Sequence, residues 1–222
     1  YICTIALIIY TQKTHTTNNA TTITTIQVGH GTSHIIQNNK HTVVIDAGSR
    51  NNIDIGFTKI IPTLQKTNVR TIDLLLITHA DLDHVGGIPA LMDVIPIHTI
   101  GLTAQAIKNA TGSLHIILGM ARARGIQTQT LSTGTTIMVG ELVFKIISPN
   151  SKKPYTTKNA TSLVVQLTTN SKQALFTGDI DEHTISSLDT SLLTPDIVEL
   201  PHHGQWSKES QLFIDSLCPK II

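Results

Sequence analysis

Short apolar runs separated by polar or glycine-containing segments recur along most of this 222-residue chain. The clearest run, Ile72–Ile77, reads Ile-Asp-Leu-Leu-Leu-Ile and is typical of a buried strand. Comparable runs predict strands at 22–28, 41–45, 97–102, 127–131, 135–139, 142–147, 162–168, 173–177 and 197–200, with a further apolar piece at 34–36. The chain is therefore expected to be rich in short strands.

Helical spacing of apolar residues marks several segments that follow the strands. One helix is expected over residues 56–67, with Pro62 near its start. Others are expected over 88–94, within 103–125, and over 182–193 and 209–217. The strands form two blocks with helices after each, and three strands end in His or Asp residues. This pattern predicts two sheets with helices outside them and a site along one edge.

The two ends of the chain suggest that it belongs to a longer protein. The first ten residues, 1–10, are apolar but too few to span a bilayer. They fit either a first strand or the end of a preceding transmembrane helix, and the polar segment 13–22 is typical of a linker. Because the chain does not begin with methionine and ends in an apolar run at 218–222, we expect a fragment.

Composition excludes only a few classes of protein and partner. The formal net charge is +1 and charged residues make up 14% of the chain, so no strong field points to nucleic acid or an anionic membrane. The two cysteines, Cys3 and Cys218, stand at opposite ends and form neither a metal-ligand spacing nor a disulfide framework. The chain is long enough for one large domain with a substantial core.

Candidate chemistry is concentrated just after the strand at 72–77. In the sequence ITHADLDHVGG, four side chains of types that can bind metals occur within six consecutive positions. They are His79, Asp81, Asp83 and His84. Further candidates follow two later strands, namely Asp179, His202 and His203. Such a cluster could hold two divalent ions with Asp179 between them. Two ions lower the pKa of a bound water and stabilise charge on the attacking and leaving oxygens, which points to hydrolysis of an ester or phosphodiester.

Each of these residues also has an ordinary structural interpretation. A single His-x-Asp in a surface loop is usually a solvated turn, and a lone histidine such as His203 is more often structural. Asp46 and Asp179 could merely cap a turn or a helix. The combination of His-x-Asp-x-Asp-His directly after a buried strand with His-His-Gly after another is much rarer. Taken together, the residues predict a metal site.

The loop THADLDHVGG resembles the HxHxDH signature of the metallo-β-lactamase superfamily, in the form that has Asp at the second His. The surrounding chain is similar to the C-terminal hydrolase domain of ComEC-type DNA-uptake (competence) proteins. The matching pieces are IQVGHGTS, VIDAG, THADLDHVGG, NATSLVVQL, ALFTGDI and VELPHHGQWS, which occur in the same order from residue 26 to about 207. The resemblance covers nearly the whole chain.

The resemblance implies an α/β (α+β) fold, the four-layer αβ/βα sandwich, with two divalent ions between the sheets. The implied metal ligands are His79, Asp81, Asp83, His84, Asp179 and His202. Asp83 would also orient the nucleophilic water, and His203 would assist the leaving oxygen, although the two neighbouring histidines could exchange roles. Asn159 stands where many members carry a ligand histidine, and here it would be either a weaker ligand or, together with Ser162, a substrate contact. With two acids in place of nitrogen donors, Mn²⁺ fits the site at least as well as Zn²⁺.

The resemblance also implies a function and a setting. The expected activity is that of a metal-dependent phosphodiesterase, a nuclease acting on DNA during uptake. Residues 1–21 would be the end of a membrane-embedded channel region and a linker, and 22–222 the hydrolase domain, truncated at its C-terminus. The domain would be tethered to a bacterial cell membrane on its extracytoplasmic side. Its partners would be DNA, the channel region of the same polypeptide and other competence proteins.

Two rival interpretations remain open. A hydrolase of a small ester, such as a phosphocholine ester or a lactone, is favoured slightly by the near-neutral charge, because DNA binding usually shows a basic footprint. A catalytically silent DNA-guiding domain is suggested by the first motif. In the family this motif usually reads D-V-G-Q-G-D, whereas residues 27–32 here read Gln-Val-Gly-His-Gly-Thr and lack both acids.

Overall fold

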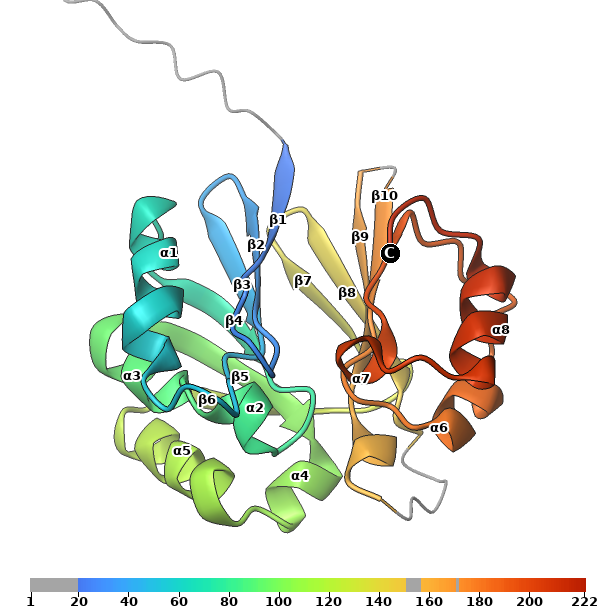
Figure 1. The fold of residues 1–222 in the computed structure, drawn as a ribbon. Helices are drawn as coiled ribbons and strands as arrows, with labels where there is room; N and C mark the ends of the chain where they lie inside the picture. Colours follow the sequence, from blue (N-terminus) through green and yellow to red (C-terminus); the bar gives the residue numbers. More distant parts are fainter. Residues whose placement is uncertain (1–19, 151–156, 171) are drawn as a thin grey trace, which may run out of the picture.

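The computed structural model describes residues 20–150, 157–170 and 172–222 (Figure 1). The expectations for the apolar segment 1–10 and for most of the linker lie outside the described residues. Within the described ranges, no helix is long and apolar enough to cross a membrane.

Six strands form the first sheet. They are β1 (Thr21–Thr25), β2 (His34–Asn38), β3 (His41–Ile45), β4 (Ile72–Leu76), β5 (Ile97–Thr103) and β6 (Gln127–Leu131). They lie side by side in sequence order, with β1 to β3 antiparallel and β3 to β6 parallel. The parallel strands β3 and β4 therefore end at the same edge, so the segments that follow them, beginning at Asp46 and Ile77, start close together.

Five strands form the second sheet. They are β7 (Thr136–Val139), β8 (Leu142–Ser148), β9 (Val164–Thr169), β10 (Lys172–Phe176) and β11 (Ile197–Val198), in the order β11-β10-β9-β8-β7. All neighbours are antiparallel except the last pair, β10 and β11, which run parallel. This parallel pair again brings two strand ends to one edge, here the ends that lead to Asp179 and to the turn at Pro201–Gly204.

Inner strands of both sheets, such as β3, β4 and β9, are mostly buried on both faces, which explains their continuous apolar runs in the sequence. Neighbouring side chains of a strand point to opposite faces. Ile36 therefore packs between the sheets against Phe144, while Ile35 packs on the outer face with residues of the helices. On the outer face of the second sheet, Leu175 packs with Phe213. Three apolar layers thus separate four layers of structure.

Helices cover the two outer faces (Figure 1). Those beside the first sheet are α1 (Ile61–Lys66, preceded by a π-helical turn at Gly56–Ile60), α3 (Ile88–Val94), α4 (Ala104–Lys108) and α5 (Gly112–Ala123). Those beside the second sheet are α6 (Glu182–Ser187) and α8 (Lys208–Leu217). Two single-turn helices, α2 (Leu82–Val85) and α7 (Pro201–Gly204), lie at the edge between the sheets. The predicted four-layer αβ/βα sandwich is confirmed.

One helix prediction needs correction. The helix expected over 182–193 ends at Ser187, because Leu188 is extended and Asp189 accepts bonds from both the backbone and the hydroxyl of Ser191, which makes a local turn. The helical spacing expected within 103–125 corresponds to two helices, α4 and α5. They are separated by extended backbone at Thr111 and by Gly112, whose φ of +54° is left-handed.

Candidate metal centre

Four chain segments converge at the edge between the sheets. The end of β4 leads to His79, and α2 carries Asp83 and His84. The end of β10 leads to Asp179, and α7 after β11 carries His203. In Figure 1, α2 and α7 face each other across this edge. The strand ends named by the sequence pattern therefore do meet.

Four of these side chains form a compact cluster. Asp83, His84, Asp179 and His203 each offer one ligand atom, and these atoms all lie within 4.8 Å of one another. The His84 Nε2 to Asp179 Oδ1 distance is 3.2 Å, and His203 Nε2 lies 3.4 Å from Asp179 Oδ2 and 3.5 Å from Asp83 Oδ2. Two imidazoles and two carboxylates at this spacing make a donor set suited to a borderline divalent ion.

The buried polar atoms of the cluster show that these residues fit a cation. Among the described residues, His79 Nε2, His84 Nε2 and Asp179 Oδ1 are buried and have no hydrogen-bond partner. The His84 and Asp179 atoms lie 3.2 Å apart but lack the alignment of a hydrogen bond. Buried polar atoms are normally satisfied, so three unsatisfied ligand atoms in and beside this cluster are best explained by bound cations. The donor set therefore suits the metal that the sequence pattern predicts.

The remaining predicted ligands lie at the rim of the cluster. His79 Nε2 is 3.7 Å from Asp179 Oδ2 and 4.0 Å from Asp81 Oδ2. The Asp81 side chain is 40% exposed, and its Oδ1 lies 3.5 Å from Lys158 Nζ. His202 is also 40% exposed, with Nε2 at 3.9 Å from Asp179 Oδ2. Of the two neighbouring histidines, the structure thus brings His203 into the cluster and leaves His202 beside it.

The two expected substrate contacts lie in a short segment next to the site. Asn159 begins a single 3-10 turn, Asn159–Thr161, and is half-buried. Ser162 is fully buried, and its hydroxyl has no hydrogen-bond partner among the described residues. The segment is held against the ligand loop, because Leu163 N donates to Thr78 O at 3.0 Å. Asn159 is therefore accessible in part, whereas Ser162 faces the interior.

Asp46 orients His84, a role that the sequence did not reveal. Its carboxylate is fully buried and accepts from Thr78 N at 2.8 Å and from the Thr78 hydroxyl at 2.6 Å. It also lies 2.7 Å from His84 Nδ1, which turns Nε2 of that ring toward the cluster. Partners of this kind fix the tautomer and orientation of a ligand imidazole. The sequence feature that could have indicated this role is Asp46 itself, an acid at the end of the strand in VIDAG, but an acid at that place also fits a simple turn.

Charges within the cluster favour a proton on His84. Burial works against the charged ring, but the carboxylates of Asp46 and Asp179 outweigh it and raise the pKa of His84 to about 10. Burial also opposes the charge of Asp179, yet the imidazoles of His203 and His84 hold the pKa of this carboxyl well below its usual range. A cation that binds here must displace the proton from His84, so binding releases protons.

The altered first motif contacts the cluster. His30 Nε2 lies 3.3 Å from Asp83 Oδ2, and its ring centroid is 4.8 Å from that of His203. The hydroxyl of Thr32 lies 3.3 Å from His203 Nδ1. The residues that replace Gln and Asp of the usual motif therefore still border the site.

The turn that presents His203 has an unusual backbone. His202 and His203 have φ values of +53° and +55°, and Gly204 follows at +82°. Two successive histidines in the left-handed region are costly unless their surroundings hold them there, and such residues cluster at functional sites. The turn is fixed by His202 N, which donates to Gly178 O at 3.0 Å.

A partly buried ion pair supports the two late ligand turns. His34 Nε2, on β2 of the first sheet, lies 2.8 Å from Oε1 of Glu199, which directly follows β11 of the second sheet. Glu199 Oε2 accepts from the backbone N–H groups of Thr177 at 2.9 Å and of Gly178 at 3.2 Å. Because His202 N donates to the carbonyl of this same Gly178, the residue before Asp179 is held through both its N–H and its carbonyl group.

Gly48 allows the closest backbone approach in the site. A Cβ at this position would lie 2.4 Å from Asp83 C and 2.5 Å from His84 N, both backbone atoms. We expect Gly48→Ala to push α2 away and to destabilise the domain by about 1–3 kcal/mol, because a packed interior resists added volume. Metal affinity should fall with it. Unfolding in urea and metal titration measure the two effects.

Gly119→Ala is the matched control for this substitution. A Cβ at Gly119, within α5, would meet nothing within 4 Å. The change should stabilise the domain by about 0.5–1 kcal/mol, because alanine is the better helix former. Equal effects of the two alanines would contradict the proposed close approach.

Comparison with known proteins identifies the class. Residues 26–217 match the family described as Metallo-beta-lactamase superfamily, so the chain belongs to this superfamily. Its fold is that of a metallo-β-lactamase-superfamily hydrolase domain, and this family implies binding of divalent metal.

Curated relatives point to a subgroup. The chain is 24% identical over 212 residues to ComE operon protein 3 of Bacillus subtilis (strain 168), covering 88% of this chain and 27% of that protein. It is 24% identical over 205 residues to Competence protein ComA of Neisseria gonorrhoeae, covering 91% of this chain and 26% of that protein. The chain thus spans about a quarter of the length of these relatives. The resemblance to competence proteins is confirmed at this level of identity.

Solved structures agree on the fold. MEM-A1, a subclass B3 metallo-beta-lactamase from a soil metagenome library, has a TM-score of 0.58 at 13% identity, over 82% of this chain and 76% of that one. The archaeal superfamily protein ST1585 from Sulfolobus tokodaii has a TM-score of 0.56 at 18% identity, over 88% of this chain and 84% of that one. At these identities the likeness shows the fold alone.

Proposed function

We propose that this domain is a metal-dependent phosphodiesterase that cleaves DNA. The observation that carries the proposal is the convergence of Asp83, His84, Asp179 and His203, with unsatisfied buried donor atoms, at an edge open to solvent. The similarity to Competence protein ComA supports DNA as the substrate.

Two metal positions are proposed, for Zn²⁺ or Mn²⁺. Asp83, His84 and His203 would hold one ion, His79 and Asp81 would hold the other, and Asp179 would lie between them. Bound divalent ions would polarise the phosphodiester and supply an activated water. The second position has one ligand fewer among these residues, so we propose that it is the weaker of the two.

The chain's own residues position the reactants. Asp83 lies between His203 and His30 with its side chain 11% exposed, a place from which its carboxylate can orient the attacking water. His203 is held by Thr32 and faces Asp179. His202 is exposed beside the cluster, so we propose that it, rather than His203, passes a proton to the leaving oxygen.

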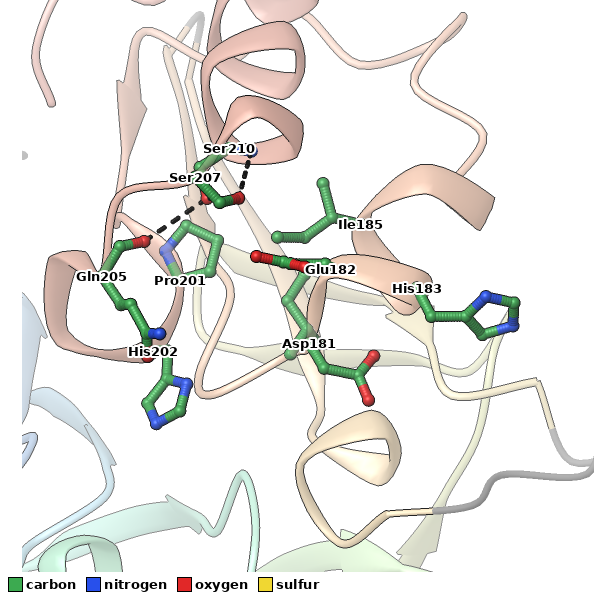
Figure 2. Close-up of a pocket in the computed structure, with 10 residues that line it drawn as sticks. Asp181, Glu182, His183, Ile185, Pro201, His202, Gln205, Ser207 and Ser210 are labelled. Carbon is green, nitrogen blue, oxygen red and sulfur yellow. Dashed lines mark hydrogen bonds between the residues drawn. The ribbon is translucent and has the colours of Figure 1, made fainter.

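One observation favours a small ester as the alternative substrate. A pocket of about 470 Å³ opens beside His202, and Asp181 and Glu182 line it together with Ser207 (Figure 2). Figure 2 shows His202 from α7 and Asp181 from the start of α6 on separate walls of this pocket. Two acids there would repel a polynucleotide backbone and would suit a cationic head group such as choline.

We further propose that the domain works within a longer membrane protein. Residues 1–21 would be the end of a membrane region and a linker, and 22–222 the hydrolase domain, placed on the extracytoplasmic side of a bacterial membrane. Its partners would be DNA, the channel region of the same polypeptide and other competence proteins. The length of the curated relatives, between three and four times that of this chain, supports this setting.

The first test is cleavage of single- and double-stranded DNA by the 222-residue chain with Mn²⁺ or Zn²⁺. We expect metal-dependent cutting that Asp83→Ala reduces by at least about 100-fold, because the change removes both a ligand and the group that orients water. Asp215→Ala, an exposed acid on α8, should retain full activity.

Each other result has a distinct meaning. Absence of cutting with ions still bound would overturn the nuclease proposal in favour of a small-ester hydrolase. Absence of both cutting and metal binding would leave a silent DNA-guiding domain.

A further inference from the structure

Three depressions in the described surface border the metal centre, and each begins at a different histidine. One, of about 470 Å³, opens at His202. A second, of about 480 Å³, opens at His203 between β1, β10 and β11. The third, of about 190 Å³, opens at His79 beside α4 and the turn 159–161, and we call it the Lys158 depression. A polymeric substrate could leave the centre along any of these paths.

The three paths differ in charge. The one at His202 carries Asp181 and Glu182, and the one at His203 is mainly apolar, with Phe176 and Leu200 in its walls and Glu199 as its acid. The Lys158 depression has no carboxylate in its lining. Besides His79 it is lined by the polar side chains Gln105, Asn109, Thr157, Lys158 and Thr161. Its ammonium and amide groups can donate hydrogen bonds to an anion.

We propose that the Lys158 depression binds the phosphate next to the scissile one in a polynucleotide. This inference rests on the proposed phosphodiesterase activity and names the substrate class that the site takes. The depression adjoins His79, so its occupant lies directly beside the metal centre. A substrate with a single phosphate would leave it empty, whereas a DNA strand would fill it.

The state of Lys158 fits this role. Its side chain is 72% exposed, and its Nζ lies 3.5 Å from Asp81 Oδ1. An exposed ion pair of this kind contributes little, so the ammonium can turn to a phosphate at small cost. Two other lining hydroxyls are already engaged: Thr157 donates to Asp181 and Thr161 donates to the Lys158 carbonyl. Lys158, Gln105 and Asn109 are therefore the groups offered to the ligand.

The test compares Lys158→Gln with wild type on two substrates, a single-stranded oligonucleotide and bis(p-nitrophenyl) phosphate, which has one phosphodiester. For the oligonucleotide we expect KM to rise about 3- to 10-fold with little change in kcat, as for loss of one charged phosphate contact. The slope of log affinity against log salt should fall by about 0.7. Kinetics on the one-phosphate ester should not change.

Lys172→Gln is the matched control. Lys172 is also an exposed lysine paired with one acid, Asp196 at 3.1 Å, but it stands at the start of β10, away from the end that leads to Asp179. Unchanged oligonucleotide KM in Lys158→Gln, or equal losses on both substrates, would overturn the subsite.

Failure of the subsite can be told apart from failure of the proposed function. If wild type cleaves neither substrate, the proposed function fails. Binding of a fluorescent oligonucleotide, followed by anisotropy, then decides the subsite alone. Weaker binding by Lys158→Gln than by Lys172→Gln would support it, and equal binding would reject it.

Discussion

Asp179→Asn is expected to abolish tight binding of divalent metal and, with it, metal-dependent hydrolysis. The carboxylate of Asp179 faces the Nε2 atoms of four imidazoles at 3.2–3.9 Å, those of His79, His84, His202 and His203. The amide keeps the shape of the side chain but removes its charge. Loss of an outer partner typically costs about 10- to 100-fold in metal affinity, and loss of a ligand between two ions should exceed that range.

The measurement is competition for Mn²⁺ or Zn²⁺ with a chromophoric chelator, together with metal content after dialysis. Asp215→Asn is the matched control, because it makes the same change on the exposed surface of α8. Near-normal affinity in Asp179→Asn would show that the cluster is not the metal centre. Circular dichroism must show that both variants are folded.

Much of the fold follows from the sequence because burial leaves a direct pattern. Strands buried on both faces read as continuous apolar runs, and β4 is the clearest case. Their ends then mark where His and Asp side chains can meet, which is why His79, Asp83, His84 and Asp179 were found as candidates. Both features depend on residues that are near one another in the chain.

Other features depend on pairs that only the folded chain brings together. Asp46 and His84 are 38 residues apart, and His34 and Glu199 are 165 residues apart. Taken separately, each of these residues has an ordinary interpretation as a turn former or a surface charge. Their partners are set by which strands pair and by how the two sheets face each other. Strand pairing and sheet packing both depend on residues far apart in the chain, so a local sequence pattern does not reveal them.

The choice between two neighbouring histidines shows the same limit. Sequence spacing treats His202 and His203 alike, and the sequence therefore left open which of them binds metal. The left-handed backbone of both residues turns His203 toward Asp83 and leaves His202 at a pocket. A backbone conformation that is rare for non-glycine residues is not predicted by a motif.

Glu199→Ala is expected to be among the most destabilising single changes in the domain. It leaves the His34 ring without its carboxylate and the N–H groups of Thr177 and Gly178 without their acceptor. Removing one partner of a buried ion pair costs about 3–5 kcal/mol, and for this pair, in which the Glu199 side chain is 17% exposed, we expect a loss near the lower end of that range. Glu199→Gln retains an oxygen for the two N–H groups, so we expect a smaller loss of about 1.5–3 kcal/mol.

The pH dependence of the unfolding free energy shows how much of the loss comes from the charges of the His34–Glu199 pair rather than from the shape of the Glu199 side chain. Burial disfavours the charge on His34, but Glu199 raises its pKa above the ordinary value of 6.5. Burial disfavours the charge on Glu199 as well, yet His34 lowers its pKa below the ordinary value of 4.5. The stabilisation by His34 is complete below pH 6.5 and is lost as pH rises through its folded pKa. That by Glu199 is complete above pH 4.5 and is lost as pH falls through its folded pKa.

The difference in unfolding free energy between wild type and Glu199→Gln should therefore be largest between pH 4.5 and 6.5 and should shrink on either side. Urea unfolding across this range measures it. Glu141→Ala, an exposed acid in the turn before β8, should stay within about 0.5 kcal/mol of wild type at every pH. A pH-independent loss in Glu199→Gln would mean that the pair is not ionised in the folded domain.

Glu199→Ala should also weaken metal binding, because Glu199 accepts from the N–H group of Gly178 while His202 N donates to the carbonyl of that residue. Without the carboxylate that accepts from Gly178 N, both the turn that carries Asp179 and the left-handed turn that carries His203 are less firmly positioned. Metal affinity in Glu199→Ala should fall about 10- to 100-fold, as for other partners behind a ligand. A purely structural pair would lower stability but leave the metal affinity of the folded protein unchanged. Chelator competition at low urea distinguishes the two, and Glu199→Gln, which keeps the acceptor, should recover most of the affinity.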